Sequence, residues 1–393
     1  MNRHLLLLTL AQGLYLTNNV AFIAINGLVG LALAPVAWMA TLPVTGYVAG
    51  GALATGLVAR SQRRFGRRGS FQLGLVVAFV SAALCAYAAT TRNFWLLTAA
   101  TMLAGFYNAN GMLYRFAAAE LVGPAYKEKA ISWVLAGGIL GAVVGPNLAS
   151  ATREWFVQPF AGVYVALMGV AVLGLAVISL VRFPPLPGAG SGAPQGRTLR
   201  EIARQPVFIV AVAACALGYG VMNLLMAATP IAMAQCAHPF SAAALVLEWH
   251  VLGMYVPSFF TGSLVRRLGA LPVMAVGLAL NVVCVAIALS GVELMHFLAA
   301  LFALGVGWNF LFIGGTTLAT EAYRPEERTT AQAGVDFWVY ATMTLTSFGS
   351  GALVTTGGWT FMNIGTLVPL TLLAAALVWL AWLRRRAGRA LAA

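Results

Sequence analysis

Residues 206–231 read PVFIVAVAACALGYGVMNLLMAATPI, a run without a single charged side chain. A helix rises about 1.5 Å per residue, so this run spans the roughly 30 Å hydrocarbon core of a bilayer. The whole chain has the same character: of its 393 residues 61% are hydrophobic and 8% are charged, against about 25% charged in a soluble domain. Long apolar runs exclude the short alternating strands of a membrane barrel. We therefore predict an all-α membrane protein.

Twelve apolar runs of this kind follow one another, and the first is too long for a cleavable signal peptide. We predict membrane spans at about 5–33, 36–59, 71–90, 95–119, 130–152, 159–181, 206–231, 242–264, 272–291, 296–320, 331–353 and 361–383.

The net charge of +13 follows the predicted topology. With the N-terminus in the cytoplasm, 20 of the 23 Lys and Arg residues lie in cytoplasmic segments, whereas Arg92 and Arg153 lie outside and Arg115 lies within a span. Positive charge in short loops fixes orientation. We expect a multi-pass protein of the bacterial inner membrane with both termini in the cytoplasm, embedded in lipid and without a nucleic-acid partner.

The two halves of the chain repeat one another. Asn108, Glu120, Pro124 and Lys127 match Asn309, Glu321, Pro325 and Arg328 at an offset of 201, and Tyr15 and Asn19 match Tyr219 and Asn223 at an offset of 204. We predict an N-terminal six-helix bundle at 1–182, a cytoplasmic linker at 183–205 with a short helix in its second part, and a C-terminal six-helix bundle at 206–393. Such repeats are typical of transporters that bind substrate near the membrane midplane.

A basic turn follows the second span of each half. The first turn contains Arg64, Gly66, Arg67 and Arg68, and the second contains Arg267 and Gly269. The first resembles the Gly-x-x-x-Asp-Arg-x-Gly-Arg-Arg loop of the major facilitator superfamily, with Ala59 and Arg63 at the Gly and Asp positions. Gly137, Gly141, Gly145 and Pro146 resemble the Gly-Pro pattern of that family's fifth span. The resemblance covers the whole chain and implies the major facilitator fold, two pseudo-symmetric six-helix bundles, alternating access and a role for these turns in gating.

Two pairs of possible metal ligands stand four residues apart, so each pair shares a helix face. They are Met222 with Met226 and His250 with Met254. Met222 and His250 both lie roughly 12–14 Å from the outer ends of their spans, and thioether and imidazole suit copper. Methionine also fills apolar cores, and a buried histidine can bind a neighbouring helix instead.

This Met-x-x-x-Met and His-x-x-x-Met combination resembles the CcoA-like copper importers, a bacterial branch of the major facilitator superfamily. The resemblance implies copper import through Met222, Met226, His250 and Met254, supplying assembly of cbb3-type cytochrome oxidase. It also implies a copper ion or small copper complex as cargo, no other cofactor, a possible cytoplasmic copper chaperone as partner, and a monomer. Relatives in this branch transport riboflavin, so riboflavin or another small organic solute is the alternative cargo.

Further polar residues are candidates for the cavity, the entrance or coupling. Met233, Cys236 and His238 could capture copper at the entrance, although we favour an ordinary mixed loop. Arg115 could bind substrate, although we favour an ion pair with Glu120. Glu248 and Asp336 could carry protons or form salt bridges, and residues 324–328 suggest a structural charge cluster. The remaining cavity candidates are Asn19, Asn108, Tyr114, Asn223 and Asn309.

Enzyme motifs are absent from the sequence. It contains no Gly-x-x-x-x-Gly-Lys-Ser/Thr loop for nucleotide hydrolysis. The four cysteines have no Cys-x-x-Cys spacing, so they indicate neither a zinc site nor a disulfide framework. We expect a secondary transporter rather than an enzyme.

Overall fold

The computed structural model describes residues 3–122, 126–184, 196–324 and 327–390. These ranges fold into helices joined by short turns. The helices are α1 (Arg3–Leu33), η1 (Ala37–Met39), α2 (Leu42–Thr90), α3 (Phe94–Gly111), α4 (Tyr114–Glu120), α5 (Lys127–Thr152), α6 (Ala161–Ser179), α7 (Leu199–Ile202), α8 (Pro206–Gln235), α9 (Phe240–Tyr255), α10 (Ser258–Leu268), α11 (Ala270–Ser290), α12 (Leu294–Ala319), α13 (Arg328–Thr356) and α14 (Gly358–Ala390).

The predicted all-helical membrane architecture is confirmed. Among the described residues, eight helices are long and apolar enough to cross a membrane, or nine if the bent pair α9 and α10 forms one span. The long helix α2 enters that total once but covers two predicted spans, and α3 with α4 and α13 cover the remaining two.

Two glycines mark the basic turns of the repeat. Gly66 interrupts α2 with a φ of 69°, and Gly269 separates α10 from α11 with a φ of 87°. This left-handed backbone is accessible to glycine at little cost, whereas a side chain would be strained there. The chain therefore reverses at equivalent points in the two halves.

Close packing of α1 on α5 explains the glycines of the fifth span. A Cβ placed on Gly137 would overlap the carbonyl oxygen of Thr9, and one on Gly141 would overlap Leu16. Small residues let two membrane helices approach closely. The glycines of α5 thus allow its close packing against α1 in the N-terminal half.

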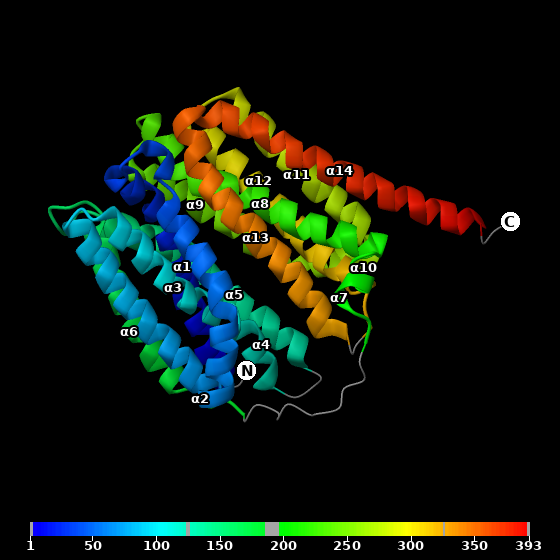
Figure 1. The fold of residues 1–393 in the computed structure, drawn as a ribbon, viewed down its shortest axis with the longest axis horizontal. Coiled ribbons are helices and arrows are strands. Elements are labelled where there is room, and N and C mark those ends of the chain that lie inside the picture. The colour runs from blue at the N-terminus through cyan, green and yellow to red at the C-terminus, as the bar shows by residue number, and fades with distance from the viewer. Residues whose placement is uncertain (1–2, 123–125, 185–195, 325–326, 391–393) are drawn as a thin grey trace.

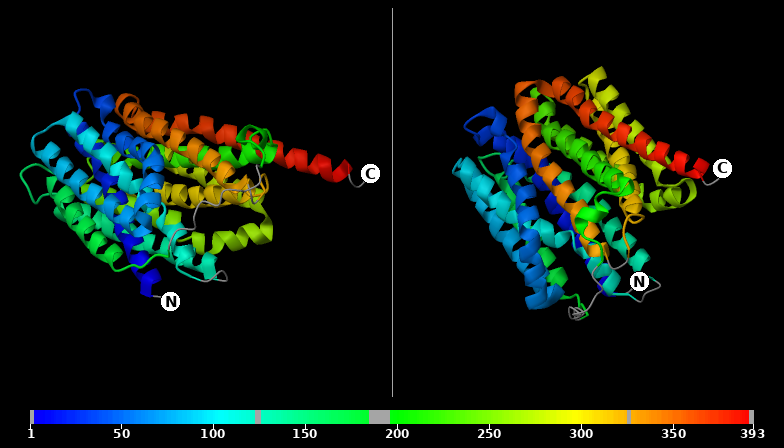
Figure 2. Two further views of the ribbon diagram at one scale, coloured as in Figure 1. Left: turned by 60° about the horizontal axis from the view of Figure 1, so that its bottom comes forward. Right: turned by 45° about the vertical axis from the view of Figure 1, so that its right-hand side comes forward.

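The helices form a bundle with two distinct ends (Figures 1 and 2). At the terminal end, α1 begins and α14 finishes; at the distal end lie the turns around residues 34–41, 153–160 and 236–239. Helices of the first half (blue to teal) and the second half (green to red) diverge toward the terminal end in Figure 1. The distal end is tied across the halves by Thr41, whose hydroxyl donates to the Ser347 carbonyl at 2.6 Å and accepts from the Gly351 N–H at 3.0 Å.

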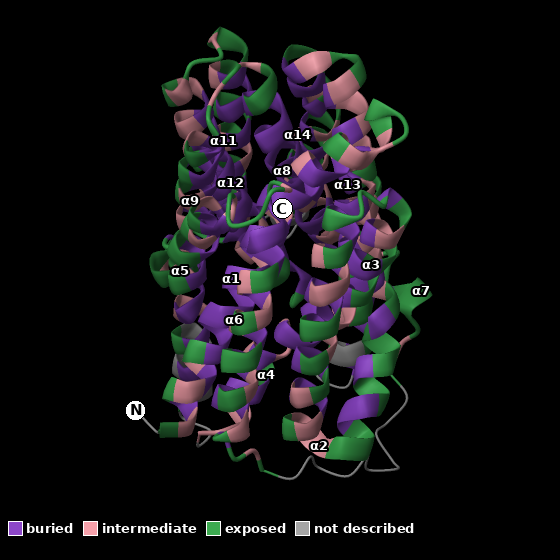
Figure 3. Ribbon diagram, turned by 90° about the vertical axis from the view of Figure 1, so that its left-hand side faces the viewer, coloured by how far each residue is buried: buried purple, intermediate pink, exposed green. Residues whose placement is uncertain are grey.

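Burial follows the pattern expected in lipid. Buried residues line the contacts between helices, and exposed ones face outward (Figure 3). Many outward side chains are large and apolar, among them Leu53, Trp95 and Leu345. A protein surrounded by hydrocarbon gains nothing from a polar outer surface.

The predicted linker is partly described. Residues 185–195 lie outside the described ranges. Its second part forms the predicted short helix α7, which begins with a capping box in which Thr198 and Glu201 bind each other's backbone N–H groups. The domain boundaries at 182/183 and 205/206 stay predictions.

Candidate functional site

A cavity of about 400 Å³ lies between the two halves. Residues of α1 to α5 line it from one side, and residues of α8 to α10, α12 and α13 line it from the other. On α12 and α13 the lining residues run from mid-helix toward the terminal end, for example from Trp308 to Thr317. The cavity therefore occupies the middle of the bundle and extends toward the terminal end, where the halves diverge.

Aromatic rings form much of the wall. Tyr219 meets Trp308 edge to face with ring centroids 5.2 Å apart, and Trp308 stacks on Phe312 at 5.1 Å with an interplanar angle of 10°. Tyr255 also packs against Trp308, at 6.3 Å. Further rings in the lining belong to Tyr15, Tyr47, Phe259 and Tyr340. These rings offer flat apolar faces to a ligand.

Four predicted amides also line the cavity, in repeat-related pairs. Asn108 accepts hydrogen bonds from the Tyr15 hydroxyl at 2.6 Å and the Asn19 amide at 3.2 Å. Its counterpart Asn309 accepts one from the Thr261 hydroxyl at 2.6 Å and donates to the Met254 carbonyl at 2.7 Å.

Asn223 donates to oxygens of α13, including the Ser347 hydroxyl at 2.8 Å. All four amides thus bind neighbouring groups while bordering the cavity.

Two charged residues face the cavity from opposite halves. Arg115 of α4 and Asp336 of α13 carry the charges among the described lining residues. The guanidinium of Arg115 lies over the Phe116 ring, 4.8 Å from its centroid, and its buried Nε has no hydrogen-bond partner. Arg115 is therefore available to a ligand.

The preferred pairing of Arg115 with Glu120 is wrong. Glu120 binds Arg67 through two hydrogen bonds, of 2.6 Å from Nη2 and 3.1 Å from Nε. The chain turns between α3 and α4 at residues 112–113, so Arg115 borders the cavity while Glu120 lies at the terminal end beside the basic turn. Arg67 also binds Gln62. Glu120 and Gln62 therefore both hold the basic turn through Arg67, although Arg63 occupies the position of the family's usual Asp.

Three of the four predicted copper ligands line the central cavity, and the fourth does not. Met222, Met226 and Met254 line the cavity, together with Met343. His250 is fully buried outside the lining, with its Nδ1 2.7 Å from the Leu301 carbonyl of α12 and its Nε2 without a partner. His250 therefore packs against α12 in this arrangement, whereas the three methionines border the cavity.

The three residues of the predicted entrance site have different surroundings, and their role stays a prediction. His238 binds the Val292 carbonyl through Nε2 at 2.8 Å, and Met233 is fully buried in the apolar core. Cys236 is half-buried. Among the described residues, no group of three His, Cys, Asp or Glu side chains could hold a metal ion.

Two other candidates lie outside the cavity. Tyr114 is fully buried and packs on Phe71, with ring centroids 4.8 Å apart. Glu248 of α9 accepts a hydrogen bond of 2.8 Å from Asn147 of α5, across the halves. In this arrangement Tyr114 packs within the first half, and Glu248 joins the two halves.

Ion pairs hold the terminal end of the second half. Arg197 binds Glu327 through Nε at 2.9 Å and Nη2 at 2.8 Å, and Arg324 donates its backbone N–H to the same carboxylate. These bonds hold the pKa of Glu327 well below its usual range. Arg384 pairs with Glu321, the repeat counterpart of Glu120. Residues 325–326 lie outside the described ranges, so Glu326 of the predicted cluster is not placed.

The remaining residues of the basic turns are exposed at the terminal end. Arg64 lies over the Phe65 ring at 5.2 Å, while Arg68 and Arg267 extend outward. Their role in gating stays a prediction.

Sequence reasoning missed several lining residues, notably Gln12, Tyr47, Tyr255, Trp308 and Tyr340. A partial signal was present. Tyr340 follows Asp336 by four residues, and Phe312 follows Trp308 by four, so each pair shares a helix face.

Comparison with known proteins agrees with this architecture. The sequence model of the Major Facilitator Superfamily matches residues 5–247 and 217–392. The chain is 39% identical over 365 residues to the riboflavin transporter RfnT of Brucella anthropi, covering 92% of this chain and 91% of that protein.

Solved structures with the same fold carry different cargoes. A bacterial metal transporter superposes with a TM-score of 0.70 at 15% identity, over 96% of this chain and 98% of that one. The nucleoside transporter NupG superposes with a TM-score of 0.71 at 11% identity, over 95% and 99%. At such identities the likeness shows the fold alone. The family match and the relative of 39% identity establish that this chain belongs to the Major Facilitator Superfamily, a family of membrane transporters.

Proposed function

We propose that this transporter carries riboflavin or a closely similar planar aromatic solute through the central cavity. The observation that carries the proposal is the composition of that cavity: rings and amides from both halves surround about 400 Å³. Cavities for organic ligands typically hold roughly 300–1,000 Å³. A bare metal ion needs only a few converging ligands.

The wall suits the two chemical parts of a flavin. Trp308 and Tyr219 offer ring faces and edges to a planar aromatic system, an interaction worth about 0.5–1.5 kcal/mol beyond apolar burial. Asn19, Asn223 and Gln12 border the same space and can hydrogen-bond carbonyl, imide and hydroxyl groups. Arg115, with its unpartnered Nε, can donate to a ring carbonyl.

The relative from Brucella anthropi supports this cargo. It carries the description of a riboflavin transporter and aligns with nearly the whole chain. We propose that the shared function includes the direction of transport, inward across the bacterial inner membrane, with the basic terminal end in the cytoplasm.

Copper import is a second candidate, favoured by one observation. Met222, Met226 and Met254 border the cavity, and thioethers suit Cu(I). His250 lies outside the lining, and to join them its unpartnered Nε2 would have to reach the cavity. Its Nδ1 could keep its 2.7 Å contact with the Leu301 carbonyl, because a metal-binding histidine commonly donates its other ring N–H to a carbonyl. The copper chaperone and the supply of cytochrome oxidase belong to this candidate alone, while the monomeric state is proposed for either cargo.

Riboflavin binding to the purified protein tests the proposal. Stacking on aromatic rings quenches flavin fluorescence, so we expect saturable quenching by the wild type and binding at least tenfold weaker in Trp308→Ala. Trp249→Ala is the matched control because Trp249 faces outward on α9 and should leave affinity unchanged. The proposal fails if the wild type shows no saturable quenching, or if both variants bind like the wild type.

A further inference from the structure

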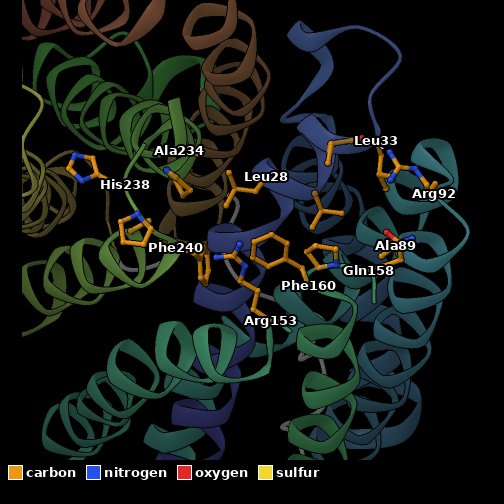
Figure 4. A pocket seen from close by; sticks show the side chains of 16 residues that line it. Leu28, Leu33, Ala89, Arg92, Arg153, Gln158, Phe160, Ala234, His238 and Phe240 are labelled. Carbon is orange, nitrogen blue, oxygen red and sulfur yellow. Dashed lines mark hydrogen bonds between the residues drawn. The ribbon is translucent and has the colours of Figure 1, made fainter. Parts of the chain in front are cut away.

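A second cavity, the distal pocket, lies between the halves at the distal end and has a volume of about 450 Å³. From the first half it is bordered by residues that include Leu28, Arg92, Arg153 and Phe160, and from the second half by His238 and Phe240. Figure 4 shows the guanidinium of Arg153 between Phe160 and Phe240. The two halves together form the walls of this pocket.

The charge of the distal pocket is one-sided. Its described lining contains two arginines and no acidic side chain. Neither Arg92 nor Arg153 belongs to an ion pair found among the described residues. With the sequence-based topology, these are the two basic residues of the outer segments, and both border this one pocket.

The Arg153 guanidinium lies between two rings, and part of it has no partner within the protein. Its guanidinium lies 5.2 Å from the Phe160 ring centroid and 5.7 Å from that of Phe240. Its Nε is buried without a hydrogen-bond partner. A guanidinium flanked by rings keeps its N–H groups in the plane between them, where they can bind a carboxylate or phosphate through two parallel bonds.

Backbone strain gathers around the same pocket. Arg92 has a φ of 54° and Phe160 a φ of 69°, while Ala237, beside His238, has a φ of 62°. These are the non-glycine residues with positive φ in the described ranges. Such strain commonly clusters at ligand sites. Here Arg92 and Phe160 themselves border the pocket.

We propose that the distal pocket binds an organic anion that carries a carboxylate or phosphate on an apolar body. Arg153 holds the anionic group. Arg92, on the other side of Phe160 (Figure 4) and donating to the Ala32 carbonyl at 3.4 Å, adds positive charge to the pocket. Leu28, Phe160 and Phe240 cover the apolar part. The anion is either a soluble solute or the headgroup of an anionic lipid, and the site is separate from the central cavity and independent of its cargo.

Isothermal titration of the full-length protein in phosphatidylcholine nanodiscs tests this proposal with 1-naphthyl phosphate as probe. We expect saturable binding, at least tenfold weaker binding of neutral 1-naphthol, at least a tenfold loss in Arg153→Gln, and a smaller loss in Arg92→Gln. Arg266→Gln, an exposed arginine at the terminal end, is the matched control and should bind like the wild type. Arg153→Lys keeps the charge without the paired donors and should lose less than Arg153→Gln.

Nanodiscs that also contain phosphatidylglycerol distinguish the two sources. Competition by that lipid would assign the site to a lipid headgroup, and undiminished probe binding would assign it to a soluble anion. Equal affinity for the phosphate and the neutral probe, or wild-type affinity in folded Arg153→Gln, would overturn the proposal.

Discussion

Tyr219 of α8 meets Trp308 of α12 edge to face, with ring centroids 5.2 Å apart, on the wall of the central cavity. The pair joins two helices of the second half and presents both rings to the same space. The Tyr219 hydroxyl forms no hydrogen bond found among the described residues, so its removal should cost the fold no internal bond. We assign the contact with a planar substrate to the ring.

Removing that ring tests its role in transport. We expect Tyr219→Ala to raise the KM for riboflavin uptake by about threefold to tenfold, the equivalent of roughly 0.5–1.5 kcal/mol of aromatic contact. Tyr219→Phe retains the ring and should transport like the wild type. Initial rates in proteoliposomes measure both, and equal KM values for the Ala and Phe variants would contradict the assignment.

Arg115 and Asp336 should act as a coupled pair, since each is the opposite charge that the other meets across the cavity. We expect Arg115→Gln and Asp336→Asn each to reduce uptake about tenfold, because each leaves a desolvated charge without its counterpart. The double variant should be less impaired than the product of the two losses, with a coupling energy of about 1 kcal/mol or more. Strictly multiplicative losses would show that the two groups act separately.

The repeat supplies a matched pair of variants for stability. Glu120 binds partly buried Arg67, whose side chain is 12% exposed, whereas both partners of the Glu321–Arg384 pair are 41% exposed or more. We expect Glu120→Gln to lower the free energy of unfolding by about 1 kcal/mol and Glu321→Gln by less than about 0.5 kcal/mol. Thermal unfolding in detergent compares them, and a larger loss in Glu321→Gln would refute this ranking.

The Glu327 carboxylate predicts a pH dependence. Its pKa is lowered in the folded protein because Arg197 and the Arg324 N–H bind the ionised form. A lowered pKa stabilises the fold above the unfolded-state value of about 4.3, and the benefit is lost as pH falls through the folded-state value. The Tm of the wild type should therefore exceed that of Glu327→Gln at pH 7, and the gap should close as the pH falls below 4. Exposed Glu293→Gln should show no such gap, and a gap for Glu327→Gln that persists in acid would contradict the prediction.

The fold could be predicted largely from the sequence because lipid imposes a simple rule. In lipid, uncharged runs such as 206–231 must be helical. The constant sequence offset between residues such as Asn108 and Asn309 indicated the internal repeat. The amides at these positions border one cavity in the structure. Residues related by the repeat were therefore the most informative guide to the site.

Other features depended on contacts that spacing does not describe. The four-residue interval from His250 to Met254 predicts a shared face, yet Met254 borders the cavity and His250 contacts the α12 backbone. The helix break at residues 112–113 places Arg115 beside the cavity and Glu120 beside Arg67. Helix periodicity indicates which residues share a face of one helix. The neighbouring helices determine what each of those side chains contacts.

Uptake by cells that can neither make nor import riboflavin tests the central claim most directly. We predict that the wild-type protein restores growth and concentrative uptake of labelled riboflavin, and that Trp308→Ala, expressed at an equal level, loses most of this uptake while Trp249→Ala keeps it. Copper accumulation, measured in the same cells, should not change with expression. No riboflavin uptake by well-expressed wild type, together with copper accumulation that is lost in Met222→Ala, would contradict the account and establish copper as the cargo.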